Sequence, residues 1–316
     1  TTGGDNTVVG SGALATEDGN GLNVAIGSGA LATLNAGADA GNVAVGYQAL
    51  TAATTGVDNV AVGASAGDAV TTGSDNTLIG DNAGGAITTG TTSVAIGSAA
   101  LLLATTGARN VAVGYQALDA ATTADNNTAI GAEALGANTS GTQNVAVGTY
   151  ALDANTTANN NTGMGYNALT ANSTGATNTA IGASALGANT TASNNTAVGA
   201  DALKVNTTGG SNVAIGALAL DANTTGANHV AIGKGALSAV TTANDLTAVG
   251  RDALLVNTSG SENVAVGSNA MVANTTGGYN VAVGNAALDA NTTASNNTAV
   301  GYASLGANIT GASNTA

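Results

Sequence analysis

The residues of this sequence that could carry out chemistry are few and scattered. His229 is the only histidine, there is no cysteine, and 18 acidic residues are spread over 316 positions. Catalysis needs a nucleophile, a base or a metal ion held among unlike neighbours, whereas this chain repeats the same neighbours along its length. The sequence has no histidine pair or histidine–carboxylate cluster of the kind that binds a transition metal. We therefore predict a non-catalytic protein without a metal or a cofactor.

The remaining chemical motifs have structural explanations. His229 stands at a position where most repeats carry Asn, so a neutral, hydrogen-bonding role explains it better than catalysis. The acidic residues do not recur at the spacing of a calcium-binding β-roll, and Asp252 is expected to be a solvated surface group. The glycine-rich stretches lack the Gly-Lys-Ser/Thr of a phosphate-binding loop. Asn-x-Thr triplets such as residues 155–157 match a glycosylation pattern, but turn chemistry explains their recurrence.

Charge and composition exclude several partners. Four basic and 18 acidic residues give a net charge of −14, which repels nucleic acid and an anionic membrane surface. The sequence has no run of 18 apolar residues, so we expect no membrane insertion by this segment. Phe, Trp and Pro are absent although 44% of the residues are hydrophobic. Such a chain must fill a narrow and uniform interior.

An internal repeat decides the architecture. One glycine follows each short apolar triplet, at intervals of 17 residues with a single interval of 19. These glycines are Gly10, Gly27, Gly46, Gly63, Gly80, Gly97, Gly114, Gly131, Gly148, Gly165, Gly182, Gly199, Gly216, Gly233, Gly250, Gly267, Gly284 and Gly301. The consensus of the 18 repeats reads N-[VT]-A-[VI]-G-x-x-A-L-x-A-N-T-T-[GA]-x-x.

The triplet before each glycine is predicted to be a strand. Its first residue is Val or Thr, its third is large and apolar, and its middle residue is Ala in all but three repeats. Alternation with a period of two and β-branched residues are typical of strands. We expect the first and third side chains to face the interior and the middle Ala to form a smooth outer face.

The Ala-Leu-x-Ala segment after the glycine is predicted to be a second short strand. Its Leu occurs in 15 of 18 repeats, with Met271 as a further apolar residue and Gly67 and Gly84 as the exceptions. The segment is too short for a helix. We place the Leu column inside, opposite the first strand. Representative members are Leu135, Leu152 and Leu186.

Two asparagine columns are predicted to form corners. The first stands four residues before the glycine and includes Asn144, Asn178 and Asn195. The second begins the Asn-Thr-Thr-Gly turn and recurs from Asn138 to Asn308. Asn is favoured in turns because it tolerates the left-handed conformation, and stacked Asn can form amide ladders between coils.

A unit of two strands and two turns cannot bury its apolar face alone, but stacked copies can. The predicted fold is therefore an all-β parallel β-solenoid of about 18 coils of 17 residues. We expect a single repeat domain over residues 1–316. Residues 1–105 are degenerate, with a two-residue insertion near residues 34–41, whereas residues 106–316 are close to the consensus.

The repeat resembles known fibre proteins. The pentapeptides at residues 110–114 and 212–216, Asn-Val-Ala-Val-Gly and Asn-Val-Ala-Ile-Gly, resemble the head repeat of trimeric autotransporter adhesins. The longer form at residues 195–209 resembles repeats of phage tail-fibre-type proteins. The resemblance covers essentially the whole chain, and the choice between the two families stays open. It implies a left-handed β-roll, a homotrimer, and an extracellular, cell-surface or virion fibre that serves adhesion or host attachment.

Two functional hypotheses follow from these patterns. In the first, outer Ala faces associate around an axis to form the trimer, and the fibre contacts a cell-surface or matrix receptor. The candidate surface contacts are Tyr47, Tyr115, Tyr166 and Tyr302. The alternative is an ice-binding, antifreeze β-solenoid that uses ladders of Thr and Asn. Adjacent Thr residues on a strand point to opposite faces, so one Thr column could meet ice.

Overall fold

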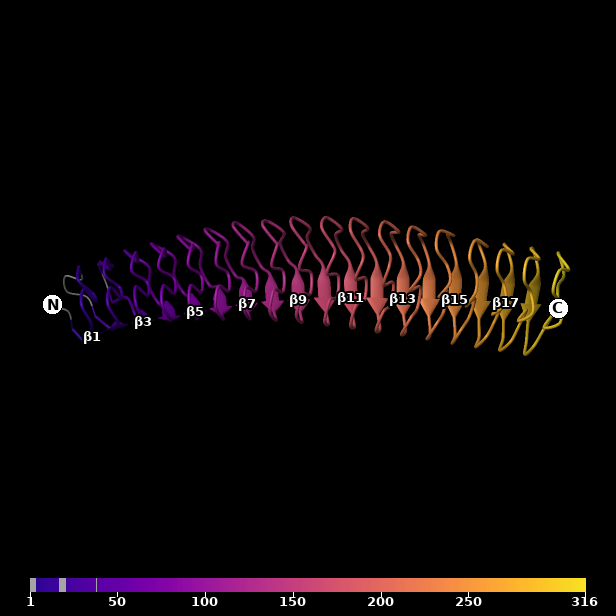
Figure 1. Cartoon of the computed structure of the whole chain (residues 1–316), viewed down its shortest axis with the longest axis horizontal. Coiled ribbons are helices and arrows are strands. Elements are labelled where there is room, and N and C mark those ends of the chain that lie inside the picture. The colour runs from indigo at the N-terminus through magenta and orange to yellow at the C-terminus, as the bar shows by residue number, and fades with distance from the viewer. Residues whose placement is uncertain (1–3, 17–20, 38) are drawn as a thin grey trace. The chain divides into compact units, whose positions relative to one another are not determined.

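The computed structural model describes residues 4–16, 21–37 and 39–316. The chain divides into two compact units, Thr1–Asn160 and Asn161–Ala316, and each is described by itself. In both units a three-residue strand recurs once in every coil, and the described residues form no helix (Figure 1). None of these residues belongs to a helix that could span a membrane.

The described residues of the first unit form nine strands. They are β1 (Thr7–Val9), β2 (Val24–Ile26), β3 (Val43–Val45), β4 (Val60–Val62), β5 (Thr77–Ile79), β6 (Val94–Ile96), β7 (Val111–Val113), β8 (Thr128–Ile130) and β9 (Val145–Val147). Each strand pairs in parallel with the next one along the chain, at the same repeat position. The insertion leaves the register of β2 and β3 intact, with Val24 opposite Val43. One of its residues, Ala38, lies outside the described residues.

The second unit repeats this arrangement. Its strands are β10 (Thr162–Met164), β11 (Thr179–Ile181), β12 (Thr196–Val198), β13 (Val213–Ile215), β14 (Val230–Ile232), β15 (Thr247–Val249), β16 (Val264–Val266), β17 (Val281–Val283) and β18 (Thr298–Val300). Consecutive strands are again parallel and in register. The predicted parallel β-solenoid with coils of about 17 residues is confirmed.

The two faces of the strands are the reverse of those expected. The middle Ala is buried, as at Ala112 and Ala197, whereas the third residue is half-buried or exposed, the latter at Ile130 and Ile181. The prediction that the large β-branched residues fill the interior, with Ala outside, is therefore wrong. The interior of a 17-residue coil is narrow and the Leu column already occupies it. Only a small side chain fits on the inner side of the strand.

The Ala-Leu-x-Ala segment is a series of turns, so the predicted second strand is also wrong. Gln116 and Leu118 have φ angles of 50° and 53°, which an extended strand excludes. The Ala117 N–H donates to the Gly114 carbonyl at 3.4 Å, and the Leu118 N–H donates to Ala134 O of the next coil at 2.9 Å. Burying the Leu side chain contributes about 1.5–3 kcal/mol, which offsets the roughly 1–2 kcal/mol cost of a left-handed backbone.

The Leu column lies inside, as predicted. Leu135, Leu152 and Leu186 are fully buried. The residue that follows each strand must be glycine, because its φ angle and the backbone of the next coil leave no space for a Cβ atom. Gly114 has a φ of 139°, and a Cβ placed on it would lie 2.5 Å from the carbonyl oxygen of Gly131 in the next coil. The same region of φ, between 130° and 139°, is occupied by Gly131, Gly148, Gly165, Gly182 and Gly199.

Leu78 shows how neighbouring coils conserve the volume of the core. It replaces the middle Ala of β5, and it lies beside Gly67 and Gly84, where the interior Leu is missing. A Cβ on Gly67 would lie 2.6 Å from Leu78 Cδ1, and a Cβ on Gly84 would lie 2.7 Å from Leu78 Cδ2. The long side chain therefore comes from the strand instead of from the turn, and three departures from the consensus compensate one another.

Replacing Leu78 by Ala should lower the free energy of unfolding by about 2–5 kcal/mol, because no other Leu fills the resulting cavity. Adding Gly67→Leu and Gly84→Leu should recover part of this loss, since Leu adopts the same left-handed φ in other coils, but a Cβ on Gly84 would still lie 2.8 Å from Ile87 Cδ1. Each glycine substitution made in the presence of Leu78 should instead destabilise the protein by overpacking. Chemical denaturation measures all four variants, and equal stability of the single and triple variants would contradict the compensation.

Candidate functional site

The most regular surface of the molecule is formed by the outward side chains at the first and third positions of the strands, here called the strand face. In the described part of the chain it consists of Val, Thr, Ile and Met, without a charged residue. Among the third-position side chains, Ile130 is 40% exposed and Ile181 is 41% exposed. Successive coils place equivalent side chains about 4.8 Å apart. Within each unit, the strand face is therefore an uncharged strip of aliphatic and Thr side chains.

Both asparagine columns are buried and form hydrogen-bonded ladders. Asn59 Oδ1 accepts hydrogen bonds from the backbone N–H and from Nδ2 of Asn76, both at 3.1 Å, and Asn76 Nδ2 also donates to Gly90 O at 2.9 Å. In the second column, Asn189 Nδ2 donates to Asn172 Oδ1 at 2.8 Å. The predicted amide ladders are confirmed. The representatives Asn144, Asn178 and Asn195 are buried in the first of them.

The burial of these ladders corrects one part of the ice-binding alternative. A buried amide that is already bonded to the next coil cannot present itself to an external lattice. The role proposed for Asn in ice binding is therefore wrong. The same burial places Asn155, the first residue of one glycosylation-like triplet, inside the solenoid, where its Nδ2 donates to Asn138 Oδ1 at 2.9 Å.

The two Thr columns of the Asn-Thr-Thr turn differ in character. The hydroxyl of the first Thr links coils: Thr207 Oγ1 donates to Thr224 O, and Thr224 Oγ1 donates to Thr241 O, both at 3.0 Å. The second Thr, such as Thr225, is exposed, and the side-chain hydrogen bonds found among the described residues do not include its hydroxyl. One column of Thr hydroxyls per unit thus faces solvent.

A group of carboxylates lies on the turn side of the first unit. Asp119 and Asp153 stand two coils apart, and a Cβ on Gly136 between them would lie 3.6 Å and 3.0 Å from their Oδ1 atoms. Burial, followed by repulsion from Glu133 and Asp119, raises the pKa of Asp153. Burial also raises the pKa of Asp119, with a smaller contribution from Glu133 and against two backbone hydrogen bonds. Across the described residues, no three His, Cys, Asp or Glu side chains are grouped so that they could hold a metal ion.

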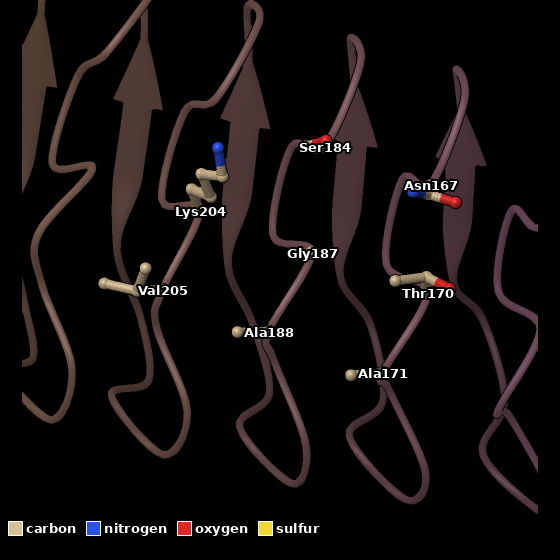
Figure 2. Close-up of a pocket in the computed structure, with 8 residues that line it drawn as sticks. All are labelled: Asn167, Thr170, Ala171, Ser184, Gly187, Ala188, Lys204 and Val205. Atoms are coloured by element: carbon tan, nitrogen blue, oxygen red, sulfur yellow. The ribbon is translucent and has the colours of Figure 1, made fainter.

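A shallow hollow of about 400 Å³ crosses three coils of the second unit. It is lined by Asn167, Thr170, Ala171, Ser184, Gly187, Ala188, Lys204 and Val205 (Figure 2). The hollow exists because Gly187 has no side chain between those of Thr170 and Lys204. The Lys204 ammonium is paired with Asp201 at 3.0 Å. Apolar walls with a few amide and hydroxyl groups and one ion-paired ammonium can contact a partner.

His229 takes the place of an asparagine in the first ladder. Its backbone N–H donates to Asn212 Oδ1 at 3.0 Å, and its Nδ1 accepts a hydrogen bond from the Leu246 N–H at 3.3 Å. Burial lowers its pKa to about 4, against weaker opposing effects of the Ala243 carbonyl and the Asp245 carboxylate. The neutral, hydrogen-bonding role predicted for this histidine is confirmed.

The four candidate tyrosines are exposed. They follow the strand-ending glycine directly, at Tyr47, Tyr115, Tyr166 and Tyr302. Within each unit the two members stand several coils apart, so the structure does not bring them together. Tyr279, which the sequence reasoning did not single out, is equally exposed but lies in a different column.

No protein-family model matches the chain, and no curated protein matches it significantly. The surfaces described above and the resemblance of the repeat therefore carry the functional argument.

Replacing Asp153 by Asn should stabilise the protein at pH 7 by up to about 1 kcal/mol, a modest value because solvent screens a partly exposed group. The raised pKa means that the folded state binds a proton more tightly than the unfolded state. The penalty is therefore present at neutral pH and disappears as the pH falls towards the unfolded value of 3.8.

Thermal unfolding of Asp153→Asn and the wild type at pH 7 and pH 3 measures this difference. The matched control is Asp221→Asn, because Asp221 occupies the same repeat position but accepts a hydrogen bond from Ser238 Oγ. This control should not gain stability. A gain for Asp153→Asn that persists at pH 3 would contradict the electrostatic cause.

Proposed function

We propose that the chain is a structural, non-catalytic segment of an extracellular or virion fibre that serves adhesion or host attachment, and that three copies associate through their strand faces. The strand face is the observation that carries this proposal. Contiguous apolar patches on soluble proteins mark interaction surfaces, because their burial removes apolar area from water. The two uncharged columns of the strand face continue through every coil of each unit.

The geometry of the strand face favours a second copy of the chain as its partner. Its side chains recur once per coil, and another copy has the same axial repeat, so a match at one coil is a match at all of them. No charge needs to be desolvated when two such faces meet, which removes the largest cost of a buried contact. The interface differs from the Ala face predicted from the sequence, since the structure places Ala inside.

The resemblance to autotransporter heads and phage tail fibres supports three copies around one axis and a position outside the cell. A repetitive body of this kind is stable as a sum of nearest-neighbour contacts and can be extended by adding coils. Contacts with a cell-surface or matrix receptor would then come from side chains that break the uniformity of the surface, of which the exposed Tyr47, Tyr115, Tyr166 and Tyr302 are candidates.

Light scattering should give three times the chain mass for the wild type. Ile181→Lys combined with Ile232→Lys should give the monomer mass, because each lysine would place an unpaired charge in the interface at a cost of several kcal/mol. The control is Val205→Lys combined with Val256→Lys. These residues are also three coils apart and have a similar exposed fraction, 37% each against 41% and 37%, but they lie outside the strand face.

The control variant should remain trimeric. A monomeric wild type at micromolar concentration, or dissociation of both lysine variants alike, would contradict association through the strand face. Circular dichroism of each variant separates loss of association from loss of folding.

Ice binding is a second candidate, favoured by the exposed Thr column at Thr208, Thr225 and their equivalents. Under the fibre proposal the wild type should show no thermal hysteresis and should not shape ice crystals. Thermal hysteresis that disappears in Thr208→Lys combined with Thr225→Lys, but persists in Ile181→Lys combined with Ile232→Lys, would replace the fibre proposal by ice binding.

A further inference from the structure

Both asparagine ladders are interrupted at the same place in the second unit. In the first ladder His229 and Leu246 replace Asn in consecutive coils, and in the second ladder Val240 does so between Asn223 and Asn257. The Nδ2 atoms of Asn223 and Asn257 donate to Gly226 O and Gly260 O in their own turns. Val240 offers no amide to continue the second ladder across its coil.

Between the coil of His229 and that of Leu246, the side chain of His229 therefore makes the hydrogen bond that the asparagine ladders make elsewhere. Its Nδ1 accepts the hydrogen bond of the Leu246 N–H at 3.3 Å, so the proton of the neutral ring is on Nε2. Nε2 is buried and forms no hydrogen bond. The imidazole reproduces the acceptor of an asparagine but not its donor.

Protonation of this ring is incompatible with the closed geometry. A proton on Nδ1 would convert the acceptor of the Leu246 N–H into a donor, so that two N–H groups would point at each other. The Leu246 N–H would lose its acceptor, and a cation would be buried with only the Ala243 carbonyl and the Asp245 carboxylate to offset its desolvation.

The surroundings of the ring supply little compensation for that charge. Asn212, Gly226 and Leu246, which contact the ring or its backbone, carry no charge. The Asp245 carboxylate, which together with the Ala243 carbonyl favours the charged ring, accepts a hydrogen bond from Asn228 Nδ2 at 3.1 Å, and the ion pairs of the described residues do not include His229. Glu262, one coil further, is exposed and donates its backbone N–H to Asn244 O.

We propose that His229 makes this joint acid-labile: protonation of its imidazole opens the solenoid between the coils of His229 and Leu246, while the regular coils stay closed. An opened joint exposes the edges of β14 and β15 and the backbone of residues 229–246. The fibre segment would then have one defined point at which an acidic environment loosens it.

The sign follows from burial. The pKa of His229 is lowered to about 4 from an ordinary value of 6.5, so the open form binds the proton more tightly than the closed form. Opening becomes more favourable as the pH falls from about 6.5 to about 4 and levels off below that. The ratio of open to closed molecules should rise by up to tenfold per pH unit, or roughly two orders of magnitude in all.

Hydrogen exchange of the full chain at pH 7, 5 and 4, corrected for intrinsic rates, tests the proposal. The amides of residues 229–246 should lose protection in acid, whereas those of residues 178–195 should keep it. His229→Asn restores the consensus amide, which accepts the Leu246 N–H without titrating, and should keep residues 229–246 protected at pH 4.

Two further variants separate titration from the broken ladders. Leu246→Asn repairs the next position but leaves the imidazole, so its acid-induced opening should persist. Asn195→His, in the regular part of the same unit, should install a second acid-labile joint at residues 195–212. Equal loss of protection in the wild type and His229→Asn, or full protection of the wild type at pH 4, would overturn the proposal.

Discussion

Every residue of this protein must be compatible with the residue at the same position in the next coil, only about 4.8 Å away. This constraint selects whole columns instead of single residues. The strand-ending glycines follow from it, since a Cβ on Gly114 would meet the Gly131 carbonyl of the next coil. The asparagine columns follow as well, because an amide is both donor and acceptor and can satisfy a neighbour identical to itself. Proline would remove an inter-coil hydrogen bond in every copy, which accounts for its absence from the sequence.

Departures from the consensus are tolerated where a neighbouring coil compensates for them. Leu78 fills the space that Gly67 and Gly84 leave, so the interior keeps its volume although three positions have changed. Similarly, Gly136 lies between Asp119 and Asp153 and has no side chain that would crowd their two carboxylates. His229 is different, because its buried Nε2 finds no partner in either neighbouring coil. Among the described residues, this nitrogen is the buried side-chain polar atom that lacks a hydrogen-bond partner.

The coil length, the strand position, the interior Leu column and the amide ladders could all be predicted from the sequence, because each depends on a residue type that recurs in register. The orientation of the strand could not. Hydrophobicity alone favours Ile130 over Ala129 for the interior, and the opposite arrangement depends on how much space Leu135 leaves. The second strand was mispredicted because Leu rarely adopts a positive φ, and the pattern of residue types does not reveal that Leu118 does so at 53°. The strand face could not be predicted either, because it depends on the orientation of the strand. Its lack of charge in every repeat can nevertheless be seen in the sequence.

The same constraint limits what such a surface can do. A catalytic site needs different groups converging on one point, whereas stacking in register multiplies identical groups along a line. A small ligand would find many equivalent sites on the strand face and none better than the others. A partner with the same axial repeat would make favourable contacts at every coil, so that weak contacts of Val and Ile would add up over the length of the unit. Under the fibre proposal, this uniformity would make association between identical copies effective, and the few irregular side chains would distinguish one external partner from another.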